Sequence, residues 1–514
     1  MRSISCNQAR KKSTRKCSVT RTVAGSDRSI WRGEPAQRRS LVKVRSYLRL
    51  RWDSFLLVLF CGTLSSCGGF KDYAPDPISQ ADITREFESN RQSLASIEEF
   101  VTEAGYQNGW PPSTWGLDEL TIAGAYFSPS IQLSRRLKEL TDAIGDSILN
   151  ESGISLSIAS EYHSREVVGD EPWGVGFVVG LPFVTKEKKK TLSDKSLLYK
   201  ESALYDLSAA AWKLHSNLRD YLLSINFVDQ QLELANQKLR LLMEVGELTQ
   251  KRVDNGFDSS IDLTKRRLAI KDFEEHVLEL ESSRVELVSK LAGEVGLPFD
   301  AFATSGIFSD LLNKQVSLLH RNAYRTIALR HRSDLQKTLV EFGISDAELK
   351  LSLIAQYPEL TFSPGYFWDQ GESVWNFALG LIMPKSSDVK ILEKEASRAV
   401  QRARVKEIQT NILSDIDTEY SSILFKQSVL SLHQEKISQA FDLMDRKVAE
   451  FERGHTNRVE LYEARIQLLD YSSRMLEDQF SLMQSIAALE DICESPAFFD
   501  SDISIVSINT KEDL

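Results

Sequence analysis

Four short segments of the chain alternate apolar residues with smaller or polar ones at a period of two. The segments are residues 154–162, 173–183, 360–368 and 375–383. In the second segment, Trp173, Phe177 and Leu181 fall on one face, and the opposite face is mostly glycine. This period predicts strands with one apolar face. The turn-like sequences within each pair, VVGDEP and DQGES, predict two β-hairpins.

Two long stretches behind the hairpins are predicted to be helical. Residues 186–252 contain no proline and one glycine, Gly246, and residues 386–452 contain neither. At 1.5 Å per residue each stretch reaches roughly 100 Å, which favours a coiled coil or a tube. After each stretch runs a ladder of apolar residues seven positions apart, with Arg284 as its polar break. The ladder positions are Leu263, Ile270, Val277, Arg284 and Leu291, and Leu461, Leu468, Met475, Leu482 and Leu489.

The two halves of the chain repeat each other. RVDNGFDSSIDL at 252–263 and EFERGHTNRVEL at 450–461 each carry a glycine, a branched apolar residue five positions on, an acid at six and a leucine at seven. A helix–step–helix pattern at 115–133 recurs at 318–336, and the hairpins recur at a shift of about 200. We infer an internal duplication.

The glycines of this repeat, Gly256 and Gly454, mark where each long helix reverses. Glycine takes the positive φ that ends a helix at low steric cost, so both are predicted to be turn residues. The acids Asp262 and Glu460 then fall in the first turn of each returning helix, where a carboxylate interacts favourably with the helix dipole.

The predicted strands have the length of tilted transmembrane β-strands, and residues 67–514 contain no apolar helix of 18 residues. A membrane-spanning form would therefore be a β-barrel. Four strands cannot close a barrel, so it would need further copies of the chain. The alternative is a small soluble sheet whose apolar face is buried.

Two groups of residues, one within the predicted strands and one directly after them, suit a membrane boundary. The aromatic residues are candidates for a belt at the membrane interface, although ordinary packing would use them equally well. They are Trp173, Tyr366, Trp368 and Trp375. The lysine-rich run 186–190 is predicted to be a solvated helix start at the membrane boundary, and a contact with anionic lipid headgroups is the alternative.

The charge is unevenly distributed along the 514 residues. Residues 1–66 hold 15 Lys/Arg and 3 Asp/Glu, and the remainder carries a net charge of −22 within a total of −10. A strongly acidic body disfavours nucleic acid as a partner.

A secretory signal peptide explains the positive charge of residues 1–66. A basic stretch precedes the apolar run Phe55–Phe60, which is too short to span a bilayer, and small residues lead to Cys67. LSSC at 64–67 resembles a bacterial lipoprotein box, which implies that Cys67 is lipidated. Gly68 after it implies sorting to the outer membrane. A plain signal peptide with an incidental cysteine is the alternative. If Cys67 is lipidated, Cys493 has no cysteine left to pair with.

Motifs of enzymes are missing from the sequence. The seven histidines are scattered, and no H-E-x-x-H, C-x-x-C, phosphate-binding glycine loop or G-x-S-x-G occurs. We therefore predict a protein that is not an enzyme, with no catalytic residue, no cofactor and no metal site.

From about Trp115 to Cys493 the chain resembles the TolC-like outer-membrane efflux proteins, the channel-tunnels of tripartite efflux and type I secretion systems. The resemblance is carried by WGLDEL…SPSI, HRSDL, YPELTFSPGYFWD, VWNFALGLIMP and the two glycine motifs, in doubled order. It implies a mainly α-helical chain with transmembrane β-structure and a duplicated helix–β-hairpin–long-helix unit. Four strands per chain would contribute to a trimeric 12-stranded β-barrel, continued by a periplasmic α-helical tunnel. The sequences after Pro182 and Pro384 depart from the pattern usual in the family.

The resemblance also implies a function. The protein would be lipid-anchored in the outer membrane, extend into the periplasm, and conduct substrate passively from a periplasmic adaptor (membrane fusion) protein and an inner-membrane transporter to the exterior. Acids near the periplasmic turns can line a cation-selective constriction, for which Asp262 and Glu460 are candidates. Asp258, Arg252 and Arg458 are candidates for ion pairs that hold the aperture shut. The alternative is a non-channel periplasmic coiled-coil lipoprotein that acts as an adaptor or scaffold.

These predictions divide the chain into five parts. They are a basic extension and lipoprotein signal peptide at 1–66, an N-terminal periplasmic segment at 67–114, repeat 1 at 115–298 with a β-hairpin at about 154–183, repeat 2 at 299–493 with a β-hairpin at about 359–384, and a C-terminal tail at 494–514.

Overall fold

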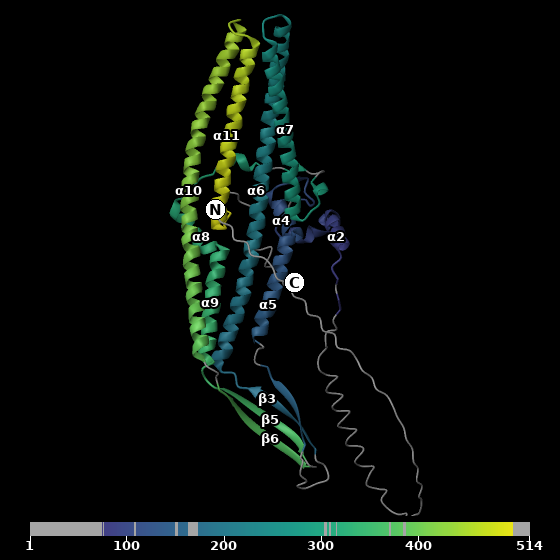
Figure 1. Ribbon diagram of the computed structural model, residues 1–514, viewed down its shortest axis with the longest axis vertical. Helices are drawn as coiled ribbons and strands as arrows, with labels where there is room; N and C mark the ends of the chain where they lie inside the picture. Colours follow the sequence, from purple (N-terminus) through teal and green to yellow (C-terminus); the bar gives the residue numbers. More distant parts are fainter. Residues whose placement is uncertain are drawn as a thin grey trace, which may run out of the picture. The chain divides into compact units, whose positions relative to one another are not determined.

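A computed structural model describes residues 74–75, 77–106, 109–149, 153–162, 173–302, 306–307, 310–314, 316–369, 372–383 and 387–496. The chain divides into two compact units, Met1–Pro77 and Ile78–Leu514. All helices and strands of the described residues lie in the second unit (Figure 1). This unit begins with three short helices: α2 (Gln80–Ser93), η1 (Leu94–Ile97) and α3 (Glu98–Glu103).

Two helix pairs occupy equivalent places in the two halves of this unit. They are α4 (Leu117–Phe127) with α5 (Pro129–Leu149), and α8 (Arg321–His331) with α9 (Ser333–Ile354). A single extended residue joins each pair: Ser128 has ψ 124° and Arg332 has ψ 114°. Pro129 disfavours the α conformation at the residue before it and itself suits the first turn of a helix. The predicted helix–step–helix pattern is confirmed in both halves.

A four-stranded sheet with the order β2-β3-β5-β6 combines the two hairpins. Its strands, each antiparallel to its neighbours, are β2 (Ser155–Tyr162), β3 (Trp173–Pro182), β5 (Glu359–Asp369) and β6 (Glu372–Ile382). They lie where the period of two predicts strands, to within three residues at each end. The register aligns Ile158, Phe177, Tyr366 and Trp375 in one row across the sheet. A minor parallel pair joins β1 (Thr114–Trp115) to β4 (Gly306–Ile307).

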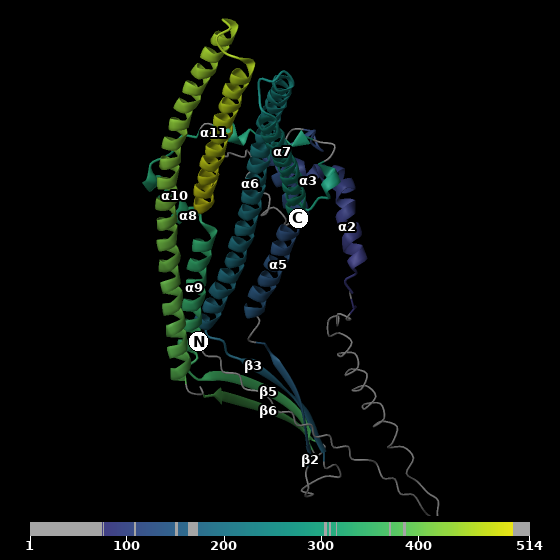
Figure 2. The same cartoon turned by 45° about the horizontal axis from the view of Figure 1, so that its top comes forward.

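Long helices continue the sheet away from the hairpins. They are α6 (Lys186–Asp254) after β3 and α10 (Ser387–Glu452) after β6, with the returning helices α7 (Ser260–Val295) and α11 (Arg458–Cys493). Next to the sheet the helices pack in the order α5, α6, α9, α10, which is the order of the strands they adjoin. Farther from the sheet, α7 and α11 take the places of α5 and α9 beside α6 (Figures 1 and 2). The strands and helices therefore form one continuous wall.

Two hydrophobic cores hold this wall together. One gathers around α4 and includes Trp115 and Leu291, and the other gathers around α8 and includes Tyr324 and Leu489. Both leucines belong to the predicted ladders, so the period of seven identified core positions. No helix of the described chain has an apolar stretch long enough to cross a bilayer.

The polar break in the first ladder also has a structural explanation. The guanidinium of Arg284 on α7 forms an ion pair with the carboxylate of Asp229 on α6. Both side chains are about 40% exposed, so the pair lies at the surface of the α6–α7 contact rather than within the core. A charged residue is therefore accommodated at this ladder position because its partner lies on the neighbouring helix.

Candidate functional site

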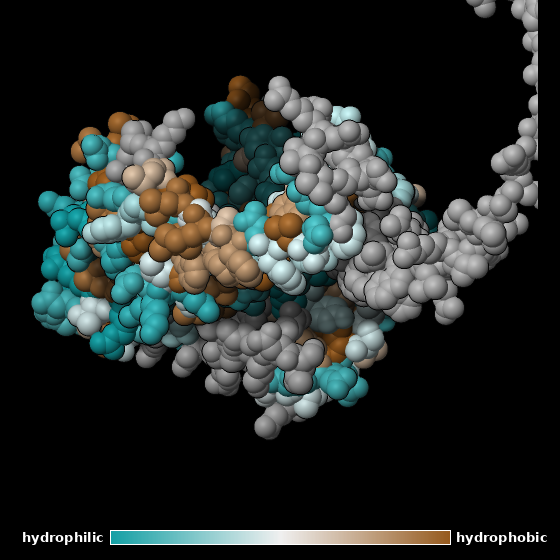
Figure 3. Space-filling view, turned by 90° about the horizontal axis from the view of Figure 1, so that it is seen from below, coloured by the Kyte–Doolittle hydropathy of each residue, from teal (hydrophilic) through white to brown (hydrophobic). Residues whose placement is uncertain are grey.

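The apolar face of the sheet is exposed in the single chain. Leu156, Phe177, Phe377 and Leu379 have 68%, 46%, 66% and 69% of their surface accessible. Seen from below, hydrophobic side chains gather across the end of the unit that carries the sheet (Figure 3). Contiguous exposed apolar surface of this kind marks contact with lipid or with another protein. The described chain therefore does not bury the apolar face of the sheet by itself.

Aromatic residues gather toward the hairpin end of this apolar face. The rings of Tyr162 and Trp173 lie 4.8 Å apart, and those of Tyr366 and Trp375 lie 5.1 Å apart. Trp368, on the same face, is 48% exposed. Exposed tryptophan and tyrosine at one level of an apolar band are typical of a bilayer interface.

The opposite face of the sheet carries small residues. A Cβ at Gly176 would lie 2.3 Å from Cδ1 of Phe367 and 2.6 Å from the carbonyl oxygen of Tyr366. A Cβ at Gly180 would lie 2.3 Å from Oγ of Ser155. Glycine is therefore required at both positions of this small-residue face, and at 176 it makes room for the ring of Phe367 on the same face.

Both outer strands leave one edge unpaired within the single chain. Among the described residues, β2 pairs only with β3, and β6 pairs only with β5. An unpaired backbone N–H or C=O group costs several kcal/mol in lipid. If the apolar face contacts lipid, each edge consequently needs a partner strand.

The two glycine turns at the other end of the long helices share one backbone structure. Gly256 has φ 78° and Gly454 has φ 75°. In each turn the glycine amide donates to the carbonyl three residues back, and the next amide donates to the carbonyl five residues back, at 2.8–3.0 Å. These are Schellman motifs. No atom lies within 4 Å of a Cβ at either position, so the positive φ alone requires glycine.

Each glycine turn leads into a helix whose N-terminus is capped by a side chain. The candidate acids of the aperture, Asp262 and Glu460, lie at equivalent positions in these two helices. Oγ of Ser259 accepts from the amide of Ile261 at 3.0 Å, and Oδ1 of Asn457 accepts from the amide of Glu460 at 2.9 Å. Asp262 and Glu460 are the third residues of α7 and α11, and their side chains are 58% and 49% exposed. The carboxylates therefore lie near the positive end of the helix dipole and remain open to solvent.

Nearby groups hold the Glu460 carboxylate in its charged form. Hydrogen bonding from Thr456, and to a smaller extent the positive charge of Lys447, lowers the pKa of Glu460 from its ordinary value. For Asp262 the nearest cation is Lys265, whose Nζ lies 3.6 Å from Oδ1.

An ion pair closes the first turn but has no equivalent in the second. The guanidinium of Arg252 donates to both carboxylate oxygens of Asp258 at 2.8 and 2.9 Å, and these bonds lower the pKa of Asp258. In the second turn Thr456 stands where Asp258 does. The guanidinium of Arg458 lies 5.9 Å from the ring centre of Phe451 and makes no ion pair within the described chain. The expected ion pair of Arg458 is thus not found.

Of the two cysteines of the predicted mature chain, the structure describes Cys493. Cys67, the predicted lipidation site, lies outside the described residues. Cys493 is a buried free thiol whose pKa is raised by burial to about 12. Its Sγ lies 3.8 Å from the carbonyl oxygen of Tyr324, so it serves as a core residue.

A buried charge cluster joins α6 to the end of α11, and no sequence motif indicates it. The side chains of Arg219 and Glu490 are fully buried, with Nη1 donating to Oε2 at 2.9 Å. Nη2 of Arg219 donates to Oδ2 of Asp491 at 2.8 Å. Asp491 also accepts from Nε1 of Trp212 at 3.2 Å and from Oγ of Ser216 at 2.7 Å. The acids lie 271 and 272 residues from Arg219 in the sequence, so only the tertiary structure assembles the cluster.

His215 lies beside this cluster and is a source of acid sensitivity. It is fully buried, and neither ring nitrogen has a hydrogen-bond partner in the described chain. Burial, together with the charge of Arg219, lowers the pKa of His215 from 6.5 to about 4. Between these two values the unfolded chain binds a proton that the folded chain does not, so stability falls as the pH drops from about 6.5 to about 4. The loss amounts to about 3 kcal/mol.

We expect His215→Leu to make thermal stability less dependent on pH below 6.5. The measurement is the midpoint of helix loss, followed by circular dichroism between pH 8 and pH 4. His276, whose side chain is 50% exposed, provides the control, and His276→Gln should keep the wild-type profile. Comparing the profiles of the variants with that of the wild type cancels every contribution to the pH dependence that all of them share. Identical acid sensitivity in His215→Leu and wild type would contradict the assignment.

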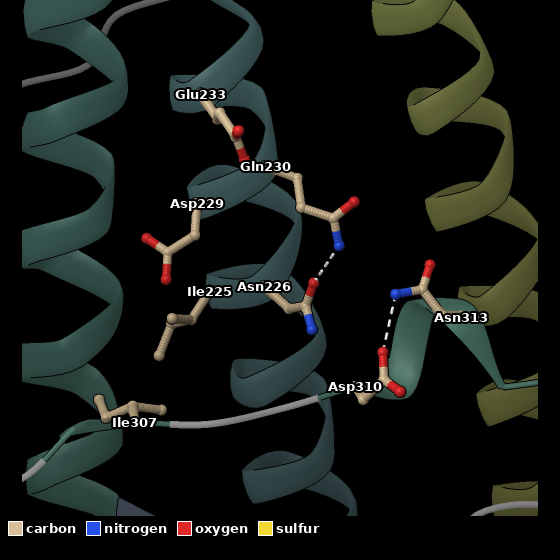
Figure 4. A pocket seen from close by; sticks show the side chains of 8 residues that line it. All are labelled: Ile225, Asn226, Asp229, Gln230, Glu233, Ile307, Asp310 and Asn313. Atoms are coloured by element: carbon tan, nitrogen blue, oxygen red, sulfur yellow. Dashed lines mark hydrogen bonds between the residues drawn. The ribbon is translucent and has the colours of Figure 1, made fainter.

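A polar pocket lies between α6 and η3 (Leu311–Asn313) (Figure 4). Its polar groups largely satisfy each other: Asn226 accepts from Gln230, Asp310 accepts from Asn313, and Asp229 pairs with Arg284. We therefore assign no ligand to it. The residues that line it are Ile225, Asn226, Asp229, Gln230, Glu233, Ile307, Asp310 and Asn313.

Comparison with known proteins identifies the fold. No protein-family model and no curated protein matches the chain. Solved structures do match: the outer membrane protein VceC from Vibrio cholerae, with a TM-score of 0.63 at 15% identity, covers 74% of this chain and 96% of its own. CusC has a TM-score of 0.63 at 14% identity, covering 76% and 95%. The open state of the MtrE outer membrane channel from Neisseria gonorrhoeae has a TM-score of 0.58 at 13% identity, covering 75% and 90%.

The chain therefore has the fold of the TolC-like outer-membrane channels, as the sequence resemblance predicted. The mainly helical architecture and the four antiparallel strands confirm the expected fold class.

Proposed function

We propose that this chain, with the fold of outer-membrane channels, forms the outer-membrane channel of a tripartite efflux or secretion system. It would conduct substrate passively from a periplasmic adaptor and an inner-membrane pump to the exterior. The observation that carries the proposal is a sheet with an exposed apolar face, two open edges and strands that continue directly into helices.

The open edges imply that several copies of the chain assemble. In lipid, β2 of one copy would pair with β6 of the next, which removes every unpaired edge. Three copies give a barrel of 12 strands, the number that the family resemblance implies. A ring of identical copies is also the common way in which one head-to-tail interface closes on itself.

The two faces of the sheet suit this arrangement. The apolar face with its aromatic end would contact lipid, and the small-residue face would line the lumen. Because each helix adjoins a strand in the same order, the lumen would continue between the helices. The chain offers no energy source of its own in this scheme, so transport would depend on the inner-membrane pump.

The glycine turns would form the periplasmic end and the aperture. Three copies of Asp262 and Glu460 would place six carboxylates around the axis, which attract cations by their field. The ion pair between Arg252 and Asp258 would fix the first turn, and Arg458, which contacts Phe451, would have a packing role instead.

Conductance in planar bilayers tests this proposal. The purified chain should form trimers that conduct ions with a preference for cations. In the variant Asp262→Asn/Glu460→Gln the cation-over-anion permeability ratio should fall by roughly threefold or more, because the carboxylates act through their field at the constriction. The matched control Glu279→Gln/Glu435→Gln removes the same charge from α7 and α10 away from the turns and should keep the ratio.

Two outcomes of this experiment count against specific parts of the proposal. Purified protein that stays monomeric and never conducts would rule out the channel. Trimers that conduct, but whose selectivity does not respond to Asp262 and Glu460, would rule out the aperture assignment alone.

A further inference from the structure

Lysines at the start of α6 lie where the sheet meets the helices, and the proposed channel gives them no role. Lys186 and Lys190 are exposed, and neither makes an ion pair within the described chain. The next two lysines of the helix, Lys195 and Lys200, both pair with acids on neighbouring helices. Three exposed lysines without an ion pair, Lys186, Lys189 and Lys190, therefore lie in the first turns of α6, directly beside the sheet.

The contact of Lys188 with β5 indicates how the first turns of α6 are oriented relative to the two faces of the sheet. Nζ of Lys188 lies 2.5 Å from Oε1 of Glu359, the first residue of β5. Leu360 belongs to the apolar face, so the preceding Glu359 belongs to the small-residue face. With 3.6 residues per turn, Lys186 and Lys190 lie about 160° around the helix from Lys188. Both therefore lie on the side of the apolar face.

Exposed apolar residues border the same junction. Ile154, Phe183 and Met383 lie at the helix ends of β2, β3 and β6 and are 71%, 60% and 67% exposed. Each continues the apolar alternation of its strand. Phe183 precedes Lys186 by three residues, so the apolar band ends where the positive charge begins. Lysine beside an apolar rim suits a bilayer surface, where its stem packs on acyl chains and its ammonium reaches the phosphates.

We propose that Lys186 and Lys190 bind the headgroup phosphates of anionic phospholipids in the leaflet next to the helices. This inference rests on the proposed function, because only a sheet inserted in a bilayer puts these lysines at headgroup level. Direct continuity with the apolar band favours lipid over an acidic protein as the partner. Glu187, the acid within the run, lies about 100° around the helix from Lys186 and about 60° from Lys190, so it flanks the site on the Lys190 side.

Lipid binding to the purified full-length chain tests this inference. Phosphatidylglycerol or phosphatidylcholine with the same acyl chains is titrated into the detergent-solubilised protein, and bound lipids are counted by native mass spectrometry. We expect phosphatidylglycerol to bind wild type more tightly than phosphatidylcholine. The phosphatidylglycerol affinity should fall about fivefold in Lys186→Ala and in Lys190→Ala, and about 25-fold in the double variant. Raising the salt concentration should remove the preference, because exposed charges are screened.

Lys188→Ala is the matched control, since it removes the same charge from the same turn but from the small-residue side. It should bind phosphatidylglycerol within about twofold of wild type. Wild-type affinity in the double variant, or an equal loss in Lys188→Ala, would overturn the inference. Conducting trimers without a phosphatidylglycerol preference would refute this inference only, whereas protein that forms no trimer and no conductance would refute the channel itself.

Discussion

Phe377→Lys is expected to abolish the membrane-inserted oligomer, whereas Ala378→Lys should preserve it. Phe377 is 66% exposed on the apolar face of β6, and its ring stacks with those of Phe362 and Trp375. A lysine at the middle of a lipid-facing strand costs about 2–4 kcal/mol, and three copies multiply the cost. Ala378 is the next residue and lies on the small-residue face opposite Ser363, where a charge would meet water. The measurement is the fraction of heat-labile, detergent-resistant oligomer in membranes.

Phe377 and Ala378 form a matched pair, because they are consecutive residues of one strand and receive the same substitution. Phe377→Leu serves as a further control that removes the ring and keeps the apolar character. Equal assembly of Phe377→Lys and Ala378→Lys would mean that the apolar face does not contact lipid. Loss in both would mean that the strand tolerates no lysine, and the Phe377→Leu result would then decide whether packing or polarity matters.

Arg219→Met is expected to lower the free energy of unfolding by about 3–5 kcal/mol. The substitution leaves the fully buried Glu490 carboxylate without its guanidinium partner and also removes the bond to Asp491. Removing one member of a buried ion pair is costly because the remaining charge stays out of water. The measurement is the urea midpoint of helix loss by circular dichroism in detergent.

Arg284→Met is the control for this substitution, since Arg284 and its partner Asp229 are each about 40% exposed. Such a surface pair contributes about 0–1 kcal/mol. The double variant Arg219→Met/Glu490→Leu should regain part of the loss, because the fully buried Glu490 carboxylate is then no longer left without its partner. If Arg219→Met is no less stable than Arg284→Met, the cluster does not join α6 to α11.

The strands, the long helices and the turns could be predicted because their signals are local. Alternation over nine to eleven residues gave the four strands to within three residues, and the absence of proline gave α6 and α10. The glycines at 256 and 454 have the positive φ that the sequence pattern predicts. The local pattern did not indicate the contact of Arg458 with Phe451, because that contact depends on how the two helices of the turn pack.

By itself, the sequence determined the period of each element, the position of each reversal and the duplication, since these follow from side-chain alternation and backbone φ within a few residues. The tertiary structure alone decided that β3 pairs with β5 across the two halves, that Arg219 meets Glu490, and that Lys188 pairs with Glu359. These contacts join residues more than 170 positions apart, and their free energies depend on burial and on neighbours that no short stretch of sequence specifies.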